Sequence, residues 1–368
     1  MERVKKVPAI RFKGFDDEWI RVSVDEVCDV SNGNMDTQDA DASGIYPFFI
    51  RSEEVMKSNK YLYDEEAILT PGEGKIGEIF HYVNGKYAAH QRVYRLFNFS
   101  KCISPTFLIY TLKNSFKNHA LKNSSTATAP SIRKGTITDF CFKTCLLEEQ
   151  TQIGNFLKNL DEKLELEKEK HEKLKIFKKA MLEDMFPKEG KKVPKVRLEG
   201  FDDEWGKYKI GNMLKYEQPA SYIVNSDKYK SSGTPVLTAN KAFILGYTNE
   251  GNVYNKGNCI IFDDFTMDFK YVDFDFKVKS SALKILTSQS HFLYFIYVLL
   301  CVQNFVSKAH RRHYIGYVQK LDVLIPSPEE QFQIGNFFKN LDEKITLSEK
   351  KIAKIENFKK AMLEKMFV

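Results

Sequence analysis

"QIGNFLKNLDEK" occupies residues 152–163, and "QIGNFFKNLDEK" occupies residues 333–344, so that eleven of the twelve residues are identical. A second repeat follows each copy, because "FKKAMLE" stands at 177–183 and again at 358–364. Self-similarity at this distance indicates a chain built from two copies of one plan.

A leader repeat precedes each half, since "KKVPAIRFKGFDDEW" at 5–19 returns as "KKVPKVRLEGFDDEW" at 191–205. Between leader and helical repeat, the two halves have about the same length but different sequences. We therefore expect four segments: a first variable domain with its leader at 1–147, a conserved helical region at 148–187, a second variable domain at 188–328 and a second conserved helical region at 329–368.

The repeated blocks have the apolar spacing of a coiled coil. Their apolar residues are separated by alternating steps of four and three, which is the heptad pattern. A 35-residue helix over 152–186 would be about 52 Å long, longer than a small domain is wide. The expected seam consists of Ile153, Leu157, Leu160, Leu164, Leu174 and Met181 in the first block and Ile334, Phe338, Leu341, Ile345, Ile352, Ile355 and Met362 in the second.

Two arrangements suit such helices. They could each cover their own domain, but a narrow heptad stripe covers a sheet poorly. Antiparallel pairing of the two helices is therefore favoured. Glu167 and His171 interrupt the first seam where Ser348 and Ile352 stand in the second. Polar groups at such positions commonly determine register.

The variable blocks contain short runs rich in Tyr, Phe, Ile and Val, broken by Gly, Asn and Asp, which are typical of strands. Each block ends in a helical pattern, at 105–121 and 291–306. The sequence thus predicts an α+β protein: two similar mixed α/β domains separated by a long antiparallel two-helix coiled coil, with approximate two-fold symmetry. The expected strands are "EAILT", "EIFHYV", "RVYRLF", "NCIIF" and "YVDFDF".

Composition bounds the class of protein. The net charge is +7, from 56 Lys+Arg against 49 Asp+Glu, a mild basic excess that is compatible with nucleic acid. The first residues lack the apolar core of a signal peptide, and the most apolar run, at 291–305, is too short to span a bilayer. Six cysteines without a Cys-x-x-Cys pair favour a reducing, cytoplasmic setting.

Two motifs invite a catalytic interpretation. "GEGKIG" at 72–77 fits a dinucleotide fingerprint, but a strand rather than a helix follows it, so we expect a glycine-rich hairpin. "FDDF" at 262–265 places neighbouring carboxylates on opposite faces of a strand, which favours strand-end acids over a metal site. Cys141 and Cys145 lack a nearby histidine pair for zinc. We therefore expect no metal, no cofactor and no catalytic residue in this chain.

Cationic, hydrogen-bonding segments precede both repeated helices, in "NSSTATAPSIRKG" at 123–135 and "SKAHRRHYIGY" at 307–317. Such residues suit phosphates and base edges, although an exposed basic loop without a ligand has the same composition. "HQRVYR" and "TANKAFILGY" are weaker candidates. The candidate DNA contacts are Lys75, Gln91, Arg92, Ser125, Thr126, Arg133, Lys134, Asn240, Lys241, Lys308, Arg311, Arg312, His313 and Tyr314.

The paired "EEQ.QIG.F...LD.K" helices, each ending in "KKAML..MF" after a variable domain, resemble the specificity subunit of Type I restriction–modification systems. "YPFFIRS", "GEGKIGEIFHY", "HQRVYR" and "ILGYT" also resemble its target recognition domains. The resemblance implies that each variable domain binds one half of a bipartite DNA site. It also implies that the coiled coil sets the spacer and docks two methyltransferase subunits. S-adenosylmethionine, ATP and Mg would act in the methyltransferase and restriction subunits.

Two alternatives stay open at this point. One is a self-sufficient enzyme with "GEGKIG" as a phosphate or cofactor loop. The other is a structural coiled-coil adaptor whose globular ends bind proteins rather than DNA.

Overall fold

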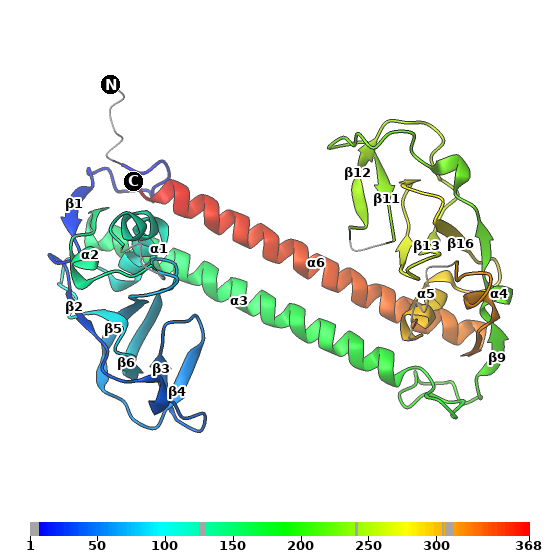
Figure 1. Ribbon diagram of the computed structural model, residues 1–368, viewed down its shortest axis with the longest axis horizontal. Helices are drawn as coiled ribbons and strands as arrows, with labels where there is room; N and C mark the ends of the chain where they lie inside the picture. Colours follow the sequence, from blue (N-terminus) through cyan, green and yellow to red (C-terminus); the bar gives the residue numbers. More distant parts are fainter. Residues whose placement is uncertain (1–6, 125–129, 240–241, 304, 306–311) are drawn as a thin grey trace. The chain divides into compact units, whose positions relative to one another are not determined.

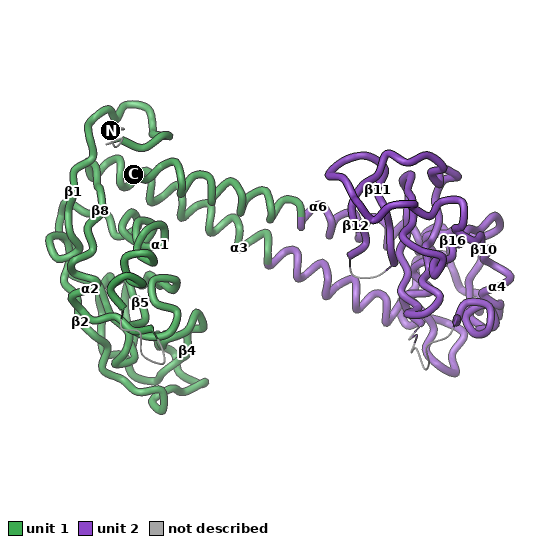
Figure 2. Tube along the Cα trace, turned by 45° about the horizontal axis from the view of Figure 1, so that its top comes forward, with its two compact units in different colours: residues 1–168, 350–368 green, residues 169–349 purple. Residues whose placement is uncertain are grey.

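The computed structural model describes residues 7–124, 130–239, 242–303, 305 and 312–368. The chain divides into two compact units, unit 1 with residues 1–168 and 350–368 and unit 2 with residues 169–349 (Figure 2). Each unit therefore holds one variable domain together with part of each long helix. In the described ranges, no helix is long and apolar enough to cross a membrane.

Unit 1 is built on a six-stranded sheet in the order β2-β7-β5-β6-β3-β4. Its elements are β1 Ile20–Ser23, β2 Asp29–Asn32, η1 Thr37–Asp39, β3 Tyr46–Phe49, β4 Val55–Ser58, β5 Tyr63–Pro71, β6 His81–Ala89, β7 Val93–Phe97, α1 Pro105–Lys122, α2 Lys134–Thr138 and β8 Cys141–Thr144. β5 is central, and its residues 67–71 are buried. Helix α1 packs on the sheet where Phe107 and Phe116 join the core that contains Ile68 and Leu96. A separate pair, β1 and β8, joins the leader to the strand before the long helix.

Unit 2 has smaller sheets, in the orders β10-β16-β13-β14 and β12-β11-β15 (Figure 1). Its elements are β9 Gly206–Lys209, α4 Ile210–Met213, β10 Lys215–Glu217, η2 Ala220–Tyr222, β11 Thr234–Leu237, β12 Ile244–Thr248, β13 Cys259–Asp263, β14 Phe269–Val272, β15 Lys277–Val278, β16 Leu283–Thr287, α5 Leu293–Val302, η3 Val318–Lys320 and β17 Asp322–Ile325. The β9–β17 pair is the counterpart of β1–β8. Helix α5 shares a core with β13 and β16 through Phe295, Phe262 and Leu286.

The α+β class is confirmed, with differences in single elements. "EAILT", "RVYRLF" and "NCIIF" lie in β5, β7 and β13. Only the end of "EIFHYV" is a strand, because β6 begins at His81. The strand prediction for "YVDFDF" is wrong beyond Val272, where β14 ends and Phe276 forms only an isolated bridge with Tyr254. Helix α5 is shorter than its apolar run, because it ends at Val302.

The repeated blocks form the long helices α3, Leu147–Asp184, and α6, Pro328–Met366, of 38 and 39 residues. Both begin before the "QIG" repeat, because acidic residues occupy the first turn and stabilise the positive end of the helix dipole. The first helix, expected over 152–186, thus starts five residues earlier and would be about 57 Å long.

In each unit, α3 and α6 lie side by side and antiparallel (Figure 1). Asp161 pairs with Lys359 in unit 1, and Lys178 pairs with Asp342 in unit 2. These two ion pairs are counterparts, since both Asp and both Lys are related by the 181-residue offset of the repeat. Every predicted seam residue is buried or half-buried.

The ends of the seam do more than pair helices. Ile153 and Leu157 belong to the same buried cluster as Trp19 and Phe107. Ile334 and Phe338 similarly lie in the cluster that contains Trp205 and Phe295. The two arrangements weighed for the helices therefore coexist, because each helix begins as a core helix of its own domain and continues beside its partner.

The repeated glycine of "QIGNF" lets α3 and α6 approach another helix closely. A Cβ on Gly154 would lie 2.5 Å from Thr106 Oγ1 and 2.9 Å from the backbone N of Phe107. A Cβ on Gly335 would lie 2.4 Å from a ring carbon of Phe292 and 3.0 Å from the backbone N of Phe295. Each glycine thus faces the start of the domain helix, where a Cβ would meet a side chain and a backbone nitrogen of that helix.

The repeated "EEQ" attaches the leader to the helix. Arg11 donates to both carboxylate oxygens of Glu149, at 2.6 and 2.8 Å, and Glu149 is fully buried. Arg197 makes the same bidentate contact with Glu330, at 2.9 and 2.8 Å. The next residue, Gln150, accepts from the N–H of Ser104 at the start of α1. The second glutamate and the glutamine of "EEQ" therefore attach the leader and the domain helix to the long helix.

The leader tryptophan of each unit packs against the end of the helix from the other half of the sequence. The ring centres of Trp19 and Phe367 are 6.3 Å apart, and Phe367 also stacks on Phe107 with ring centres 5.4 Å apart. In unit 2, the ring centres of Trp205 and Phe186 are 5.7 Å apart. A backbone bond accompanies each contact, from Ile10 N–H to Lys365 in unit 1 and from Val196 N–H to Asp184 in unit 2.

Substituting Gly154→Ala should destabilise the protein, although alanine favours helix by about 1 kcal/mol over glycine. The added methyl group meets backbone atoms that cannot move aside, and such overpacking costs about 1–3 kcal/mol. Urea unfolding followed by circular dichroism measures the change. Asn155→Ala, at an exposed position in the same turn, is the control and should be neutral. Equal or higher stability of Gly154→Ala would contradict the close approach.

Substituting Arg11→Met should cost about 3–5 kcal/mol of unfolding free energy, because it leaves the buried carboxylate of Glu149 without its partner. Lys13→Met removes a positive charge from an exposed neighbour and should change little. The same unfolding experiment compares the two variants. If they unfold alike, the bidentate contact does not anchor the leader.

Candidate nucleic-acid interface

Backbone hydrogen bonds collect the unit 1 candidates on one surface. The N–H of Gly72 donates to the carbonyl of Arg92 at 2.9 Å, and the N–H of Ile132 donates to the carbonyl of Gly72 at 2.9 Å. Gly74 also donates to Pro130 at 3.0 Å. These bonds join residues 72–75, 91–92 and 130–134, here called the unit 1 loop surface. Its exposed candidates are Lys75, Gln91, Arg92, Arg133 and Lys134.

The "GEGKIG" segment is the connection between β5 and β6, as predicted for a glycine-rich hairpin. Gly74 and Gly77 have positive φ angles of 81° and 69°, which favour glycine. A Cβ on Gly77 would lie 2.7 Å from the Cα of Lys117 in α1. Gly77 therefore lets this loop pack closely against α1.

Three further residues of this surface were not among the predicted contacts: Asp36, Arg51 and Glu73. Arg51 Nη1 donates to Glu73 Oε2 at 3.1 Å, and Arg92 Nη1 donates to Glu73 Oε1. Burial raises the pKa of Glu73, but the two guanidinium groups outweigh this effect and the pKa is lowered. The carboxylate is therefore ionised at neutral pH. Sequence reasoning missed the cluster because an ion pair between residues 22 apart has no local pattern.

Hydrogen bonds to Asp36 and His90 fix the turn that carries Gln91 and Arg92. Gln91 Nε2 donates to Asp36 Oδ2 at 3.1 Å. Buried His90 accepts at Nδ1 from the N–H of Arg92 at 3.0 Å. Burial and the charge of Arg51 lower the pKa of His90, so its ring is neutral near pH 7. The Nε2 atom of this ring lies 4.0 Å from Asp36 Oδ1. The position of Arg92 is thus determined by its backbone as well as by Glu73.

A hollow of about 410 Å³ opens beside these residues. Thr37, Ile50, Arg51, Ser52, Glu73 and Gly74 line it. The hollow therefore exposes both hydrogen-bond donors and acceptors at the edge of the loop surface.

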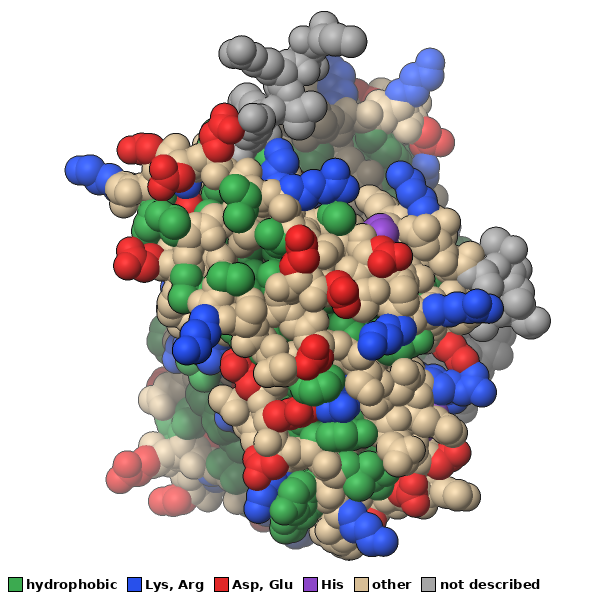
Figure 3. All heavy atoms as spheres, turned by 90° about the vertical axis from the view of Figure 1, so that its left-hand side faces the viewer, with side chains coloured by type: hydrophobic (Ala, Val, Ile, Leu, Met, Phe, Trp, Pro, Cys, Tyr) green, Lys and Arg blue, Asp and Glu red, His purple; other side chains and the backbone are tan. Residues whose placement is uncertain are grey.

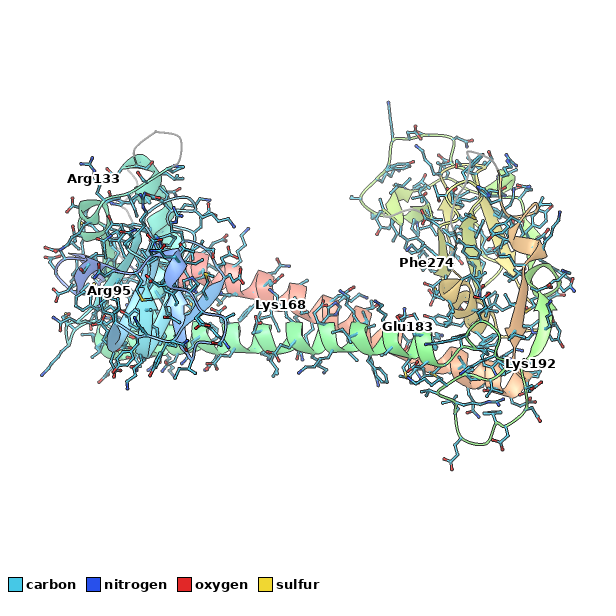
Figure 4. The ribbon with its side chains drawn as sticks, turned by 60° about the horizontal axis from the view of Figure 1, so that its bottom comes forward. Arg95, Arg133, Lys168, Glu183, Lys192 and Phe274 are labelled. Carbon is cyan, nitrogen blue, oxygen red and sulfur yellow. The ribbon has the colours of Figure 1, made fainter. Side chains whose placement is uncertain are left out.

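Charge alone does not mark an interface on the face in Figure 3, where basic, acidic and hydrophobic side chains are interspersed. The burial of each side chain distinguishes structural arginines from exposed ones more clearly. Arg95 lies within the domain, 6% exposed, with its guanidinium 3.6 Å from the ring centre of Tyr63. Arg133 points outward from unit 1 (Figure 4). Of these two arginines, only Arg133 is available to a ligand.

In unit 2, the structure revises the candidates of the "SKAHRRHYIGY" segment. Arg312 is exposed, 6.0 Å from the ring centre of Phe265. His313 and Tyr314 are buried, at 4% and 0% exposure. Tyr314 belongs to the core with Phe262, so its side chain cannot reach DNA in this conformation, and the prediction of contacts by these two residues needs correction. The candidates Ser125, Thr126, Asn240, Lys241, Lys308 and Arg311 lie outside the described residues.

The "FDDF" acids have structural partners, as expected for strand-end residues. Asp263 accepts from the N–H groups of Phe265 and Thr266 and so shapes the turn after β13. Asp264 is buried, accepts from the N–H of Tyr314 at 2.8 Å, and lies 3.3 Å from the Nζ of buried Lys284. Across the described part of the chain, His, Cys, Asp and Glu form no group of three that could hold a metal ion.

Known proteins share this organisation. A model of the Type I restriction modification DNA specificity domain matches residues 16–176 and again residues 202–357. The specificity subunit of the Type I restriction enzyme EcoR124I/EcoR124II from Escherichia coli is 43% identical over 141 residues, covering 36% of this chain and 34% of the relative. The EcoDI specificity subunit from Escherichia coli is 34% identical over 169 residues, covering 45% of this chain and 37% of the relative. These matches span little more than a third of either relative.

Among solved structures, the S subunit of a Type I restriction-modification system from M. genitalium has a TM-score of 0.80. The alignment covers 98% of this chain and 99% of that one at 16% identity, so it shows a shared fold. The family model, in contrast, matches both halves of the sequence, from leader to long helix. The chain therefore belongs to the family of the Type I restriction modification DNA specificity domain.

Proposed function

We propose that this chain is the DNA sequence-specificity subunit of a Type I restriction–modification complex. Each variable domain reads one half of a bipartite DNA site. The paired helices set the spacing between the half-sites and dock methyltransferase subunits. The chain itself performs no catalysis, because S-adenosylmethionine, ATP and Mg act in the methyltransferase and restriction subunits.

The observation that carries this proposal is a duplicated family domain in which the leader and helix contacts are the same but the variable domains differ. Both family matches include a long helix with its buried glutamate, Glu149 or Glu330. The arginines that pair with these carboxylates, Arg11 and Arg197, lie a few residues before each matched range. The sheets between them differ, with six strands in one unit and four plus three in the other. A constant frame with different recognition surfaces suits a DNA site whose halves have unlike sequences.

The outer faces of the long helices support docking of two copies of one partner. Leu166 and its counterpart Leu347 are 65% and 67% exposed. Phe177 and its counterpart Phe358 are each 46% exposed. One such leucine and one such phenylalanine belong to each unit. Single exposed apolar side chains are ordinary, but their occurrence at the same positions of both repeats matches a partner that binds twice.

Sequencing the methylated sites of cells that carry this chain and its methyltransferase tests the proposal. We expect one split motif with a fixed spacer. The purified chain alone should bind duplex DNA with steep salt dependence and should not bind S-adenosylmethionine in calorimetry. A methylome without a split motif would contradict the function. Absence of DNA binding would instead favour a protein-binding adaptor.

Substituting Leu166→Asp or Leu347→Asp should reduce methyltransferase binding from two copies to one, and the double variant should abolish it. A charge at the centre of an apolar contact must lose its water on binding, which is costly. Size-exclusion chromatography with light scattering measures the stoichiometry. Ile45→Asp, at a 78% exposed position outside the helices, is the control and should keep both copies. Two bound copies on the double variant would exclude this surface.

Substituting Arg312→Ala should weaken DNA binding by the assembled complex several-fold at low salt and leave methyltransferase stoichiometry unchanged. An exposed guanidinium that neutralises a phosphate also contributes to the salt dependence, so the slope of log affinity against log salt should fall by about one. Fluorescence anisotropy across a salt series measures both effects. Lys320→Ala removes another exposed charge of unit 2 and should have little effect. Loss of methyltransferase binding in Arg312→Ala would contradict the assigned role.

A further inference from the structure

Glu73 holds two arginines that approach it from different loops. Arg51 follows β3, and Arg92 lies in the turn before β7. Each uses only Nη1 toward the carboxylate, Arg51 on Oε2 and Arg92 on Oε1. The two guanidinium groups are thus fixed in one small area by a single carboxylate.

The opposite edge of each guanidinium remains available. Arg51 and Arg92 are 49% and 55% exposed. Among the described residues, their Nε and Nη2 atoms donate no hydrogen bond. A guanidinium edge with two parallel N–H groups matches the O6 and N7 acceptors of guanine in the major groove. Two charges of +1 against one of −1 also leave this cluster with a net positive charge, which favours an electronegative partner.

Connecting the loops does not require these ion pairs. The backbone already joins the segments, through Gly72 N–H to Arg92 O and His90 N–H to Phe49 O, each at 2.9 Å. What the carboxylate adds is orientation, because it removes the rotational freedom of two long side chains before a ligand arrives. The 410 Å³ hollow lined by Arg51 and Glu73 gives a base edge room beside them.

We propose that Arg51 and Arg92 read guanine in the half-site recognised by unit 1, and that Glu73 is the positioning residue that orients both. This inference rests on the proposed function. In the complex, the free edge of at least one guanidinium donates to O6 and N7 of a guanine, while Glu73 itself contacts no base.

The test uses the chain assembled with its methyltransferase, with Arg51→Lys, Arg92→Lys and Glu73→Gln as variants. Lysine keeps the positive charge but loses the two-pronged edge. Glutamine keeps the size of Glu73 but loses its negative charge and replaces one of the two acceptor oxygens with an NH₂ donor, so one arginine loses its partner atom. Arg21→Lys, on exposed β1 of the same unit, is the control. Methylome sequencing gives the motif, and anisotropy with duplexes changed one base pair at a time gives the discrimination at each position.

We expect Arg51→Lys or Arg92→Lys to lower the preference for guanine at one position of one half-site by about ten- to a hundredfold. The other half-site and the salt slope should not change. Glu73→Gln should lower the preference at the same position, and it should have no further effect in an Arg51→Lys, Arg92→Lys background. That dependence separates positioning from a general loss of stability.

Two results would overturn the inference while leaving the proposed function intact. One is a uniform loss of affinity for all duplexes, which would assign the arginines to phosphates. The other is an unchanged motif in all three variants. A wild-type complex without any split motif would overturn both the inference and the proposed function.

Discussion

The ion pair between a "LDEK" aspartate and an "FKKAM" lysine is the constraint on which the rest of the structure depends. It is formed twice, by Asp161 with Lys359 and by Asp342 with Lys178. Each aspartate also accepts a hydrogen bond from a domain tyrosine, Tyr110 at 2.7 Å or Tyr294 at 2.8 Å. In an antiparallel pair, the start of one helix meets the end of the other. Both repeated words must therefore occur in both helices, and a change in one copy of a word alters the contact in one unit.

The residues that hold each domain on the long helices are distinct from those of its exposed loops. Glu149, Gly154 and their counterparts contact the leader or the domain helix, and their partners are backbone atoms or matched side chains. The loops that these contacts leave free differ between units, as does the sheet beneath them. The packed contact residues and the exposed loop residues meet opposite physical demands. Close packing tolerates few residues, whereas an exposed loop on a rigid support tolerates many. One chain can therefore keep the same helix and leader contacts in both units while its exposed loops differ.

Local patterns predicted the elements well where one period dominated. The four-three spacing predicted both helices, and the glycines of "GEGKIG" predicted a hairpin connection rather than a cofactor loop. The prediction of contacts was weaker. Tyr314 resembled a DNA contact because it follows arginines, yet Asp264 draws its backbone into the core. Glu73 resembled an ordinary loop acid, although it joins Arg51 and Arg92 across 22 and 19 residues. Neither relation has a sequence period, because both join segments that only the folded chain brings together.

The sequence by itself determined that the chain is a duplication with two long helices and two unlike domains, because repeats and heptads are local regularities that survive without coordinates. Only the tertiary structure decided that Phe367 completes the core around Trp19 as Phe186 does around Trp205. It alone also decided which cations stay exposed on a common surface. Burial and side-chain orientation depend on the packing of distant segments, and a periodic pattern carries no information about which distant segment fills a given space.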